Sequence, residues 1–85
     1  MTKPKNLIIE ADGGSRGNPG PAGSGAVVID ADTGEVLLEI AKFIGVATNN
    51  VAEYLALKAG LEGAVDLNPA ARYLVRMDSK LVIEQ

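Results

Sequence analysis

The chain has 85 residues, of which 47% are apolar, so it can form one small globular domain and is not expected to be disordered. It contains neither cysteine nor histidine, which excludes disulfide scaffolds, zinc sites built from these residues and catalytic triads that use histidine. The formal net charge of −3 argues against nucleic-acid binding through a basic patch alone.

Three strands are predicted in the first half of the chain. Residues 7–11 form an aliphatic run that predicts the first strand, and residues 26–29 predict the second. Between them, residues 12–25 contain six glycines and two prolines, a composition typical of a long loop. Residues 30–35 are typical of a hairpin loop, so the third strand, residues 36–44, is expected to pair antiparallel with the second.

A helix and a fourth strand are predicted to follow. Residues 48–50 are favourable N-cap residues, and the Ala- and Leu-rich segment 51–66 predicts the helix. Small side chains recur along it every three or four positions, so one face can approach a sheet closely. Residues 73–77 predict the fourth strand, and Asp78-Ser79 are typical of the cap of another short helix. Because the first helix lies in a crossover, the fourth strand should run parallel to an earlier strand.

Three carboxylates are expected to meet at one edge of this sheet. Asp12 follows the first strand and Asp78 follows the fourth. If the two strands are adjacent and parallel, these residues lie side by side, because neighbouring strands are about 4.8 Å apart. Glu53, in the first turn of the predicted helix, would point to the same place. Three close carboxylates repel one another unless a cation lies between them, and oxygen ligands suit Mg²⁺ or Mn²⁺.

Each of these residues also has a simpler interpretation. Asp12 followed by glycine is a common turn dipeptide, and Asp78 could serve only as a helix cap. Glu53 is favoured near a helix N-terminus by the helix dipole, and Asn49-Asn50 could serve only as caps. The glycine-rich segment lacks the Gly-Lys-Ser/Thr ending of a phosphate-binding P-loop, so a nucleotide site of that kind is excluded.

Three motifs together resemble type 1 ribonuclease H. The first is IEADGGS at residues 9–15, continued by GNPGP at 17–21 and GSGA at 23–26. The second is TNNVAE at residues 48–53, and the third is MDS at residues 77–79. The motifs occur in the family's order and cover essentially the whole chain. In particular, the chain resembles the N-terminal ribonuclease H domain that some bacteria fuse to a phosphatase-like domain.

The resemblance implies an α/β fold, a ribonuclease H-like mixed sheet with strand order 3-2-1-4 and a crossover helix. The family's fifth strand and its fourth metal-binding carboxylate have no counterpart in this sequence. Residues 1–85 are therefore expected to be one ribonuclease H-like domain that is truncated at its C-terminus. A phosphatase-like domain is expected downstream in a longer parent protein.

The resemblance also implies a set of functional residues. Asp12, Glu53 and Asp78 match catalytic carboxylates that hold two Mg²⁺ ions, for which Mn²⁺ can substitute, and the backbone of Gly13 is a further candidate ligand. The activity implied is endonucleolytic hydrolysis of the RNA strand of RNA–DNA hybrids, which leaves 5′-phosphate and 3′-hydroxyl ends. The positions expected to contact the hybrid are Asn18, Thr48, Asn49, Asn50, Ser79 and Lys80. A lysine at the last of these favours contact with a phosphate over readout of bases.

The missing fourth carboxylate keeps two other interpretations open. The chain could be a non-catalytic module that binds nucleic acid, or a fragment that needs downstream sequence to fold. The acidity does not decide among them, because two bound Mg²⁺ ions would change the formal charge from −3 to +1.

A membrane partner is not expected. No apolar run approaches the roughly 18 residues of a membrane span. Residues 1–6 are polar and no apolar segment typical of a signal peptide follows them. We therefore expect a cytoplasmic location.

Overall fold

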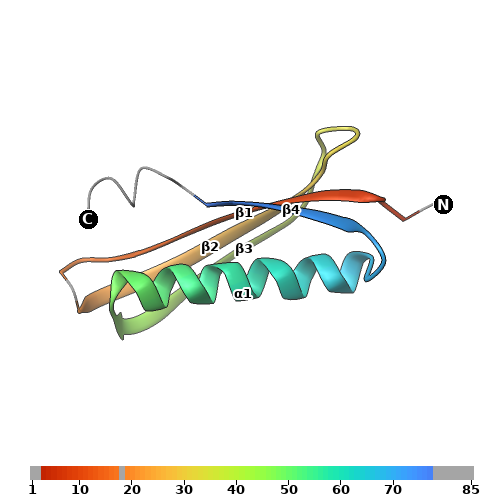
Figure 1. Cartoon of the computed structure of the whole chain (residues 1–85). Helices are drawn as coiled ribbons and strands as arrows, with labels where there is room; N and C mark the ends of the chain where they lie inside the picture. The colour runs from red at the N-terminus through yellow and green to blue at the C-terminus, as the bar shows by residue number, and fades with distance from the viewer. Residues whose placement is uncertain (1–2, 18, 78–85) are drawn as a thin grey trace.

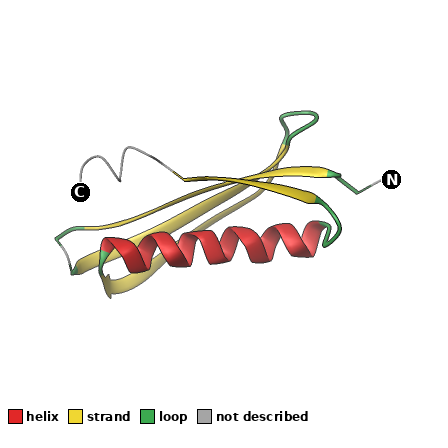
Figure 2. Cartoon of the chain, in the orientation of Figure 1, coloured by secondary structure: helices red, strands yellow, loops and turns green. Residues whose placement is uncertain are grey.

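A single helix lies across one face of a four-stranded sheet in the computed structural model, which describes residues 3–17 and 19–77. Figure 1 shows the helix running along the length of the sheet, and Figure 2 shows the two layers that result. The elements, in chain order, are β1 (Asn6–Ser15), β2 (Gly20–Asp30), β3 (Val36–Ala47), α1 (Asn49–Leu67) and β4 (Arg72–Met77). No helix within the described ranges has the length and apolar character needed to cross a membrane.

The sheet has the order β3-β2-β1-β4, which confirms the predicted topology. β1 pairs antiparallel with β2, and β2 pairs antiparallel with β3. β4 returns after the helix and pairs parallel with β1, with Ala11 opposite Met77. The crossover helix therefore brings Met77, the last described residue, beside Ala11, and the prediction that Asp12 follows the first strand was wrong, because Asp12 lies within β1.

The prediction of a long glycine-rich loop was wrong. β1 continues to Ser15 and β2 begins at Gly20, and the two strands remain paired from Asp12 opposite Gly25 to Ser15 opposite Ala22. Glycine is depleted in strands because it has no side chain to pack, but it keeps both backbone groups that form the ladder. Composition therefore indicated a loop in a segment whose backbone is paired.

β3 is three residues longer than predicted, and its end contains an irregularity. Ala22 pairs with Gly45 while its neighbour Gly23 pairs with Phe43, so one residue of β3 is left without a partner. Gly45 has a φ of +91°, a conformation that side chains disfavour and that is common at β-bulges. The bulge allows the strand to bend before the chain enters α1.

The core lies between β1, β2 and α1. The fully buried large side chains are Leu7, Ile9 and Val28, and small residues of the helix pack against them. Gly60 shows how close this packing is, because a Cβ atom there would lie 2.5 Å from Cγ2 of Ile9. The small-residue stripe predicted from the sequence is therefore the face by which α1 contacts the sheet. Its buried members are Ala52, Ala56, Gly60, Gly63 and Ala64.

Candidate active site

The end of β1 touches the first turns of α1 through a glycine. Gly13 is buried, and the place where a Cβ atom would stand is occupied by the backbone carbonyl of Ala52, with the amide nitrogen of Glu53 2.7 Å away. Only a residue without a side chain fits this approach. The residue after Asp12 therefore packs directly against the backbone of Ala52 and Glu53.

A second contact ties the start of the helix to the end of the same strand. The side-chain oxygen of Asn49 accepts a hydrogen bond from the backbone N–H of Ser15 at 2.7 Å and from its hydroxyl at 3.1 Å. Asn49 is the first residue of α1 and Ser15 is the last of β1. The two elements are thus joined both at Gly13 and two residues beyond it.

The helix begins earlier than the sequence predicted, because its N-cap is Thr48. The Thr48 hydroxyl accepts a hydrogen bond from the backbone N–H of Val51 at 3.3 Å. Asn49 and Asn50 are therefore helical residues and not caps, which corrects one of the alternative interpretations. For the same reason Glu53 does not lie in the first turn, which contains no acidic residue.

Loss of this cap is expected to destabilise the protein. Thr48→Ala should lower the free energy of unfolding by about 1 kcal/mol, since one helix N–H loses its acceptor. Thr48→Ser keeps the hydroxyl and should leave stability nearly unchanged. Urea denaturation followed by circular dichroism measures both, and equal stability in the two variants would contradict the assignment of the cap.

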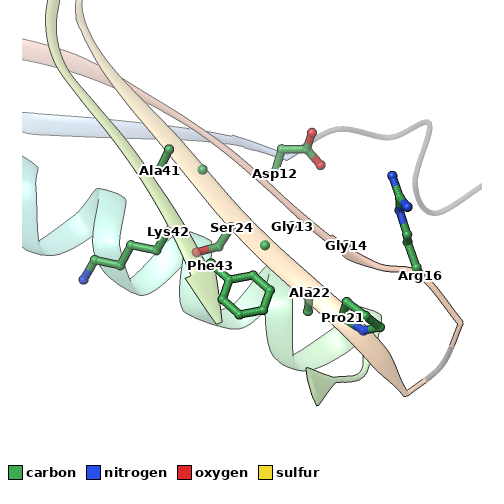
Figure 3. A pocket seen from close by; sticks show the side chains of 12 residues that line it. Asp12, Gly13, Gly14, Arg16, Pro21, Ala22, Ser24, Ala41, Lys42 and Phe43 are labelled. Atoms are coloured by element: carbon green, nitrogen blue, oxygen red, sulfur yellow. The ribbon is translucent and has the colours of Figure 1, made fainter. Parts of the chain in front are cut away.

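Asp12 lies on the face of the sheet that the helix leaves uncovered. Its side chain is exposed and lines two adjoining hollows of about 760 and 700 Å³ on this face. In Figure 3 the side chains of Asp12 and Arg16 project to the same side of β1, whereas Lys42 extends away from them. Arg16 lines the larger hollow with Asp12, so a cation lies on the same side of β1 as this carboxylate (Figure 3).

Arg16 was not among the site residues predicted from the sequence. The signal for it was available, because it is the cation within the glycine-rich first motif, between Ser15 and Gly17. It was overlooked because the segment was interpreted as a loop, in which the direction of a side chain cannot be predicted. A strand that extends to Ser15 places Arg16 directly beyond the paired end of β1, where its N–H donates to the carbonyl of Pro21 at 2.8 Å.

The predicted site residues fall into two groups. One group lies near the end of β1 or the start of α1, with the Asp12 side chain on the face that α1 leaves uncovered; its members are Asp12, Gly13, Thr48, Asn49, Asn50 and Glu53. The others lie outside the described residues, namely Asn18, Asp78, Ser79 and Lys80. Within the described ranges no three Asp, Glu, His or Cys residues come close enough together to hold a metal ion.

The two predicted metal ligands that lie within the described ranges, Asp12 and Glu53, are both carboxylates. Such a donor set fits a hard cation such as Mg²⁺ and does not fit zinc or copper, which favour histidine or cysteine. Met77 pairs with Ala11, the residue before Asp12.

Comparison with protein families gives a match over nearly the whole chain. The family model described as "Reverse transcriptase-like" matches residues 10–85. The bifunctional protein Rv2228c of Mycobacterium tuberculosis is 65% identical over 79 residues, which cover 93% of this chain and 21% of that protein. Ribonuclease HI of Halobacterium salinarum is 51% identical over 74 residues, which cover 87% of this chain and 36% of the relative.

Solved structures show the same architecture. The N-terminal RNase H domain of Rv2228c, determined as a fusion with maltose-binding protein, superposes with a TM-score of 0.82 at 64% identity, covering 94% of this chain and 60% of that one. LC11-RNase H1 in complex with an RNA/DNA hybrid superposes with a TM-score of 0.78 at 46% identity, covering 94% and 59%. The chain thus spans about a fifth of Rv2228c and about three fifths of these solved chains.

Proposed function

The chain belongs to the reverse transcriptase-like family of ribonuclease H-like domains, and we propose that it hydrolyses the RNA strand of RNA–DNA hybrids. Cleavage is endonucleolytic and leaves 5′-phosphate and 3′-hydroxyl ends. Relatives named ribonuclease HI and a similar structure solved with an RNA/DNA hybrid support this proposal. The observation that supports it most is the Gly13 contact, in which the residue after Asp12 packs against the backbone of Ala52 and Glu53.

The proposed metal ligands are the carboxylates of Asp12, Glu53 and Asp78. When bound, Mg²⁺ supplies positive charge that stabilises the phosphate and its developing negative charge, and Mn²⁺ is expected to substitute. The carboxylates are negatively charged, so without metal they should repel a phosphate backbone. Activity is therefore expected to depend strictly on a divalent cation.

The chain's polar residues at this junction position the hybrid. Thr48, Asn49 and Asn50 lie at the N-terminus of α1, where the helix dipole favours contact with a phosphate. Arg16 offers a charge-assisted hydrogen bond to a phosphate on the side of Asp12. The family resemblance adds Asn18, Ser79 and Lys80 as further contacts. RNA is distinguished from DNA by its 2′-hydroxyls, which these side chains can contact in the minor groove.

Removal of the metal tests the proposal directly. With Mg²⁺, the purified chain is expected to cut the labelled RNA strand of a hybrid and to leave double-stranded DNA intact. With EDTA, cutting should stop, because no cation remains to hold the phosphate between the carboxylates. Cutting that continues in EDTA, or cutting of the DNA strand, would contradict the proposal.

A matched pair of variants on α1 separates the proposed site from the rest of the helix. Glu53→Gln should lower the cleavage rate by about 10²-fold, the effect typical of losing one preorganised electrostatic group. Glu62→Gln removes the same charge from an exposed position two and a half turns along the helix and should leave the rate unchanged. Equal rates in the two variants would count against Glu53 as a metal ligand.

A non-catalytic binding module is the second candidate. The two candidates differ in a fluorescence-anisotropy titration with labelled hybrid in Mg²⁺. Hybrid that binds and remains uncut over hours would support the binding module, whereas hybrid that is cut supports the enzyme.

A further inference from the structure

We infer that Gly13 is a positioning residue, and that its missing side chain sets the spacing between the carboxylates that bind metal. This inference rests on the proposed function and deepens it. It assigns to Gly13 a role that differs from that of a backbone metal ligand, since the role depends on the absence of a Cβ atom.

The geometry at Gly13 shows why any side chain would displace the helix. A Cβ atom there would overlap the carbonyl oxygen and carbonyl carbon of Ala52 and would lie 2.7 Å from the amide nitrogen of Glu53. All three atoms belong to the helix backbone, so no rotation of a side chain can relieve the overlap. The first turns of α1 must therefore move away from β1, and the backbone of Glu53 must move with them.

The neighbouring contact between Asn49 and Ser15 determines how the helix moves. Asn49 bonds to Ser15 at 2.7 Å, so the helix is held at its first residue while the overlap pushes at Ala52, one turn further on. The helix responds by tilting about the Asn49 contact. Asp12 stays with β1, which is paired on both sides with β2 and β4. The separation between Asp12 and Glu53 increases as a result.

Metal binding is the quantity most sensitive to this separation. A displacement of about 1 Å at a catalytic group can cost about 10²-fold in rate, since the reacting geometry is lost. The adjacent glycine lacks such a constraint, because a Cβ atom at Gly14 would meet only the side-chain oxygen of Asn49, at 3.8 Å. Gly13 and Gly14 are therefore a matched pair in which the same added methyl group acts on different surroundings.

The test compares Gly13→Ala with Gly14→Ala in the whole 85-residue chain. Electron paramagnetic resonance of free Mn²⁺ measures metal affinity independently of cleavage. Gly13→Ala should weaken Mn²⁺ binding by at least about tenfold, by the same sensitivity to displacement, while Gly14→Ala binds as the wild type does. Ala52→Gly in the Gly13→Ala background should not restore binding, because the overlapping atoms are backbone atoms.

Two further measurements separate positioning from simple destabilisation. Val28→Ala removes buried volume from the core without touching the Gly13 contact, so it supplies a variant of lowered stability with the site intact. It should bind Mn²⁺ as the wild type does. If Gly13→Ala is partly unfolded at 25 °C, the comparison is made at 4 °C in sucrose, which favours the compact state.

The outcomes are distinct. A wild-type chain that binds Mn²⁺ and cuts hybrid, with equal Mn²⁺ affinity in both glycine variants, overturns the inference and leaves the proposed function intact. Equal loss of affinity in Gly13→Ala and Val28→Ala also overturns it. A wild-type chain that neither binds Mn²⁺ nor cuts hybrid overturns the proposed function and this inference with it.

Discussion

Asp12→Asn is expected to reduce cleavage of RNA–DNA hybrids on the order of 10³-fold, the scale seen when one preorganised electrostatic group is lost from an active site. The substitution keeps the size of the side chain and removes its charge. Asp12 is exposed within β1 and no described ion pair depends on its charge, so the fold should be unaffected. Binding of the hybrid should persist, because one negative charge facing the phosphates is removed.

Glu10→Gln is the matched control for this prediction. Glu10 lies two residues before Asp12 on the same strand and the same face, and its carboxylate pairs with Arg76 at 3.2 Å. Both partners are about half exposed, and such surface pairs contribute at most about 1 kcal/mol to stability. Glu10→Gln should therefore keep full activity. A similar loss in both variants, measured as single-turnover rates, would mean that net charge and not a specific site explains the effect.

Ile9→Ala is expected to give the largest loss of stability among substitutions in β1. Ile9 is fully buried between the sheet and α1, and Cγ2 of its side chain fills the space that the absent side chain of Gly60 leaves. Truncation to alanine in such a position costs about 2–5 kcal/mol, because apolar burial is lost and a cavity remains. Small domains have total stabilities near the lower end of about 5–15 kcal/mol, so a large fraction of the variant should be unfolded at 37 °C.

Ile8→Ala is the matched control, since the neighbouring residue has the same side chain on the opposite face. Ile8 is only partly buried and points to the face that α1 does not cover. Its truncation should cost about 1 kcal/mol or less, because little apolar surface returns to water. Urea denaturation of both variants measures the difference. Equal losses of stability would show that the buried layer between β1 and α1 is not the main core.

Local patterns predicted the strands and the directions of their pairing, whereas the strand order 3-2-1-4 was implied by the resemblance to ribonuclease H. Aliphatic runs located the strands, and a helix between the third and fourth strands required a parallel crossover. The crossover rule alone does not say which earlier strand lies beside β4, and the structure shows that it is β1, with Met77 opposite Ala11, the residue before Asp12.

The details at the site were less predictable, because they depend on contacts between distant segments. The glycine-rich stretch pairs as β1 and β2, although its composition indicated a loop. The helix starts at Asn49 because the Thr48 hydroxyl is its cap. Residues 48–50 are all favourable N-cap residues, so the sequence alone did not show which of them is the cap. The overlap between a Gly13 side chain and the backbone of Ala52 arises only when the two elements pack together.

We propose that Asp12 and Glu53, near the junction of β1 and α1, support metal-dependent cleavage of RNA in a hybrid. The most direct measurement is the single-turnover rate at which the 85-residue chain cuts a 5′-labelled RNA strand paired with DNA, in Mg²⁺, beside Asp12→Asn and Glu10→Gln. The account predicts cutting by the wild type and by Glu10→Gln, and almost none by Asp12→Asn. An uncut hybrid with a wild-type chain that unfolds cooperatively, or equal cutting by all three chains, would contradict it.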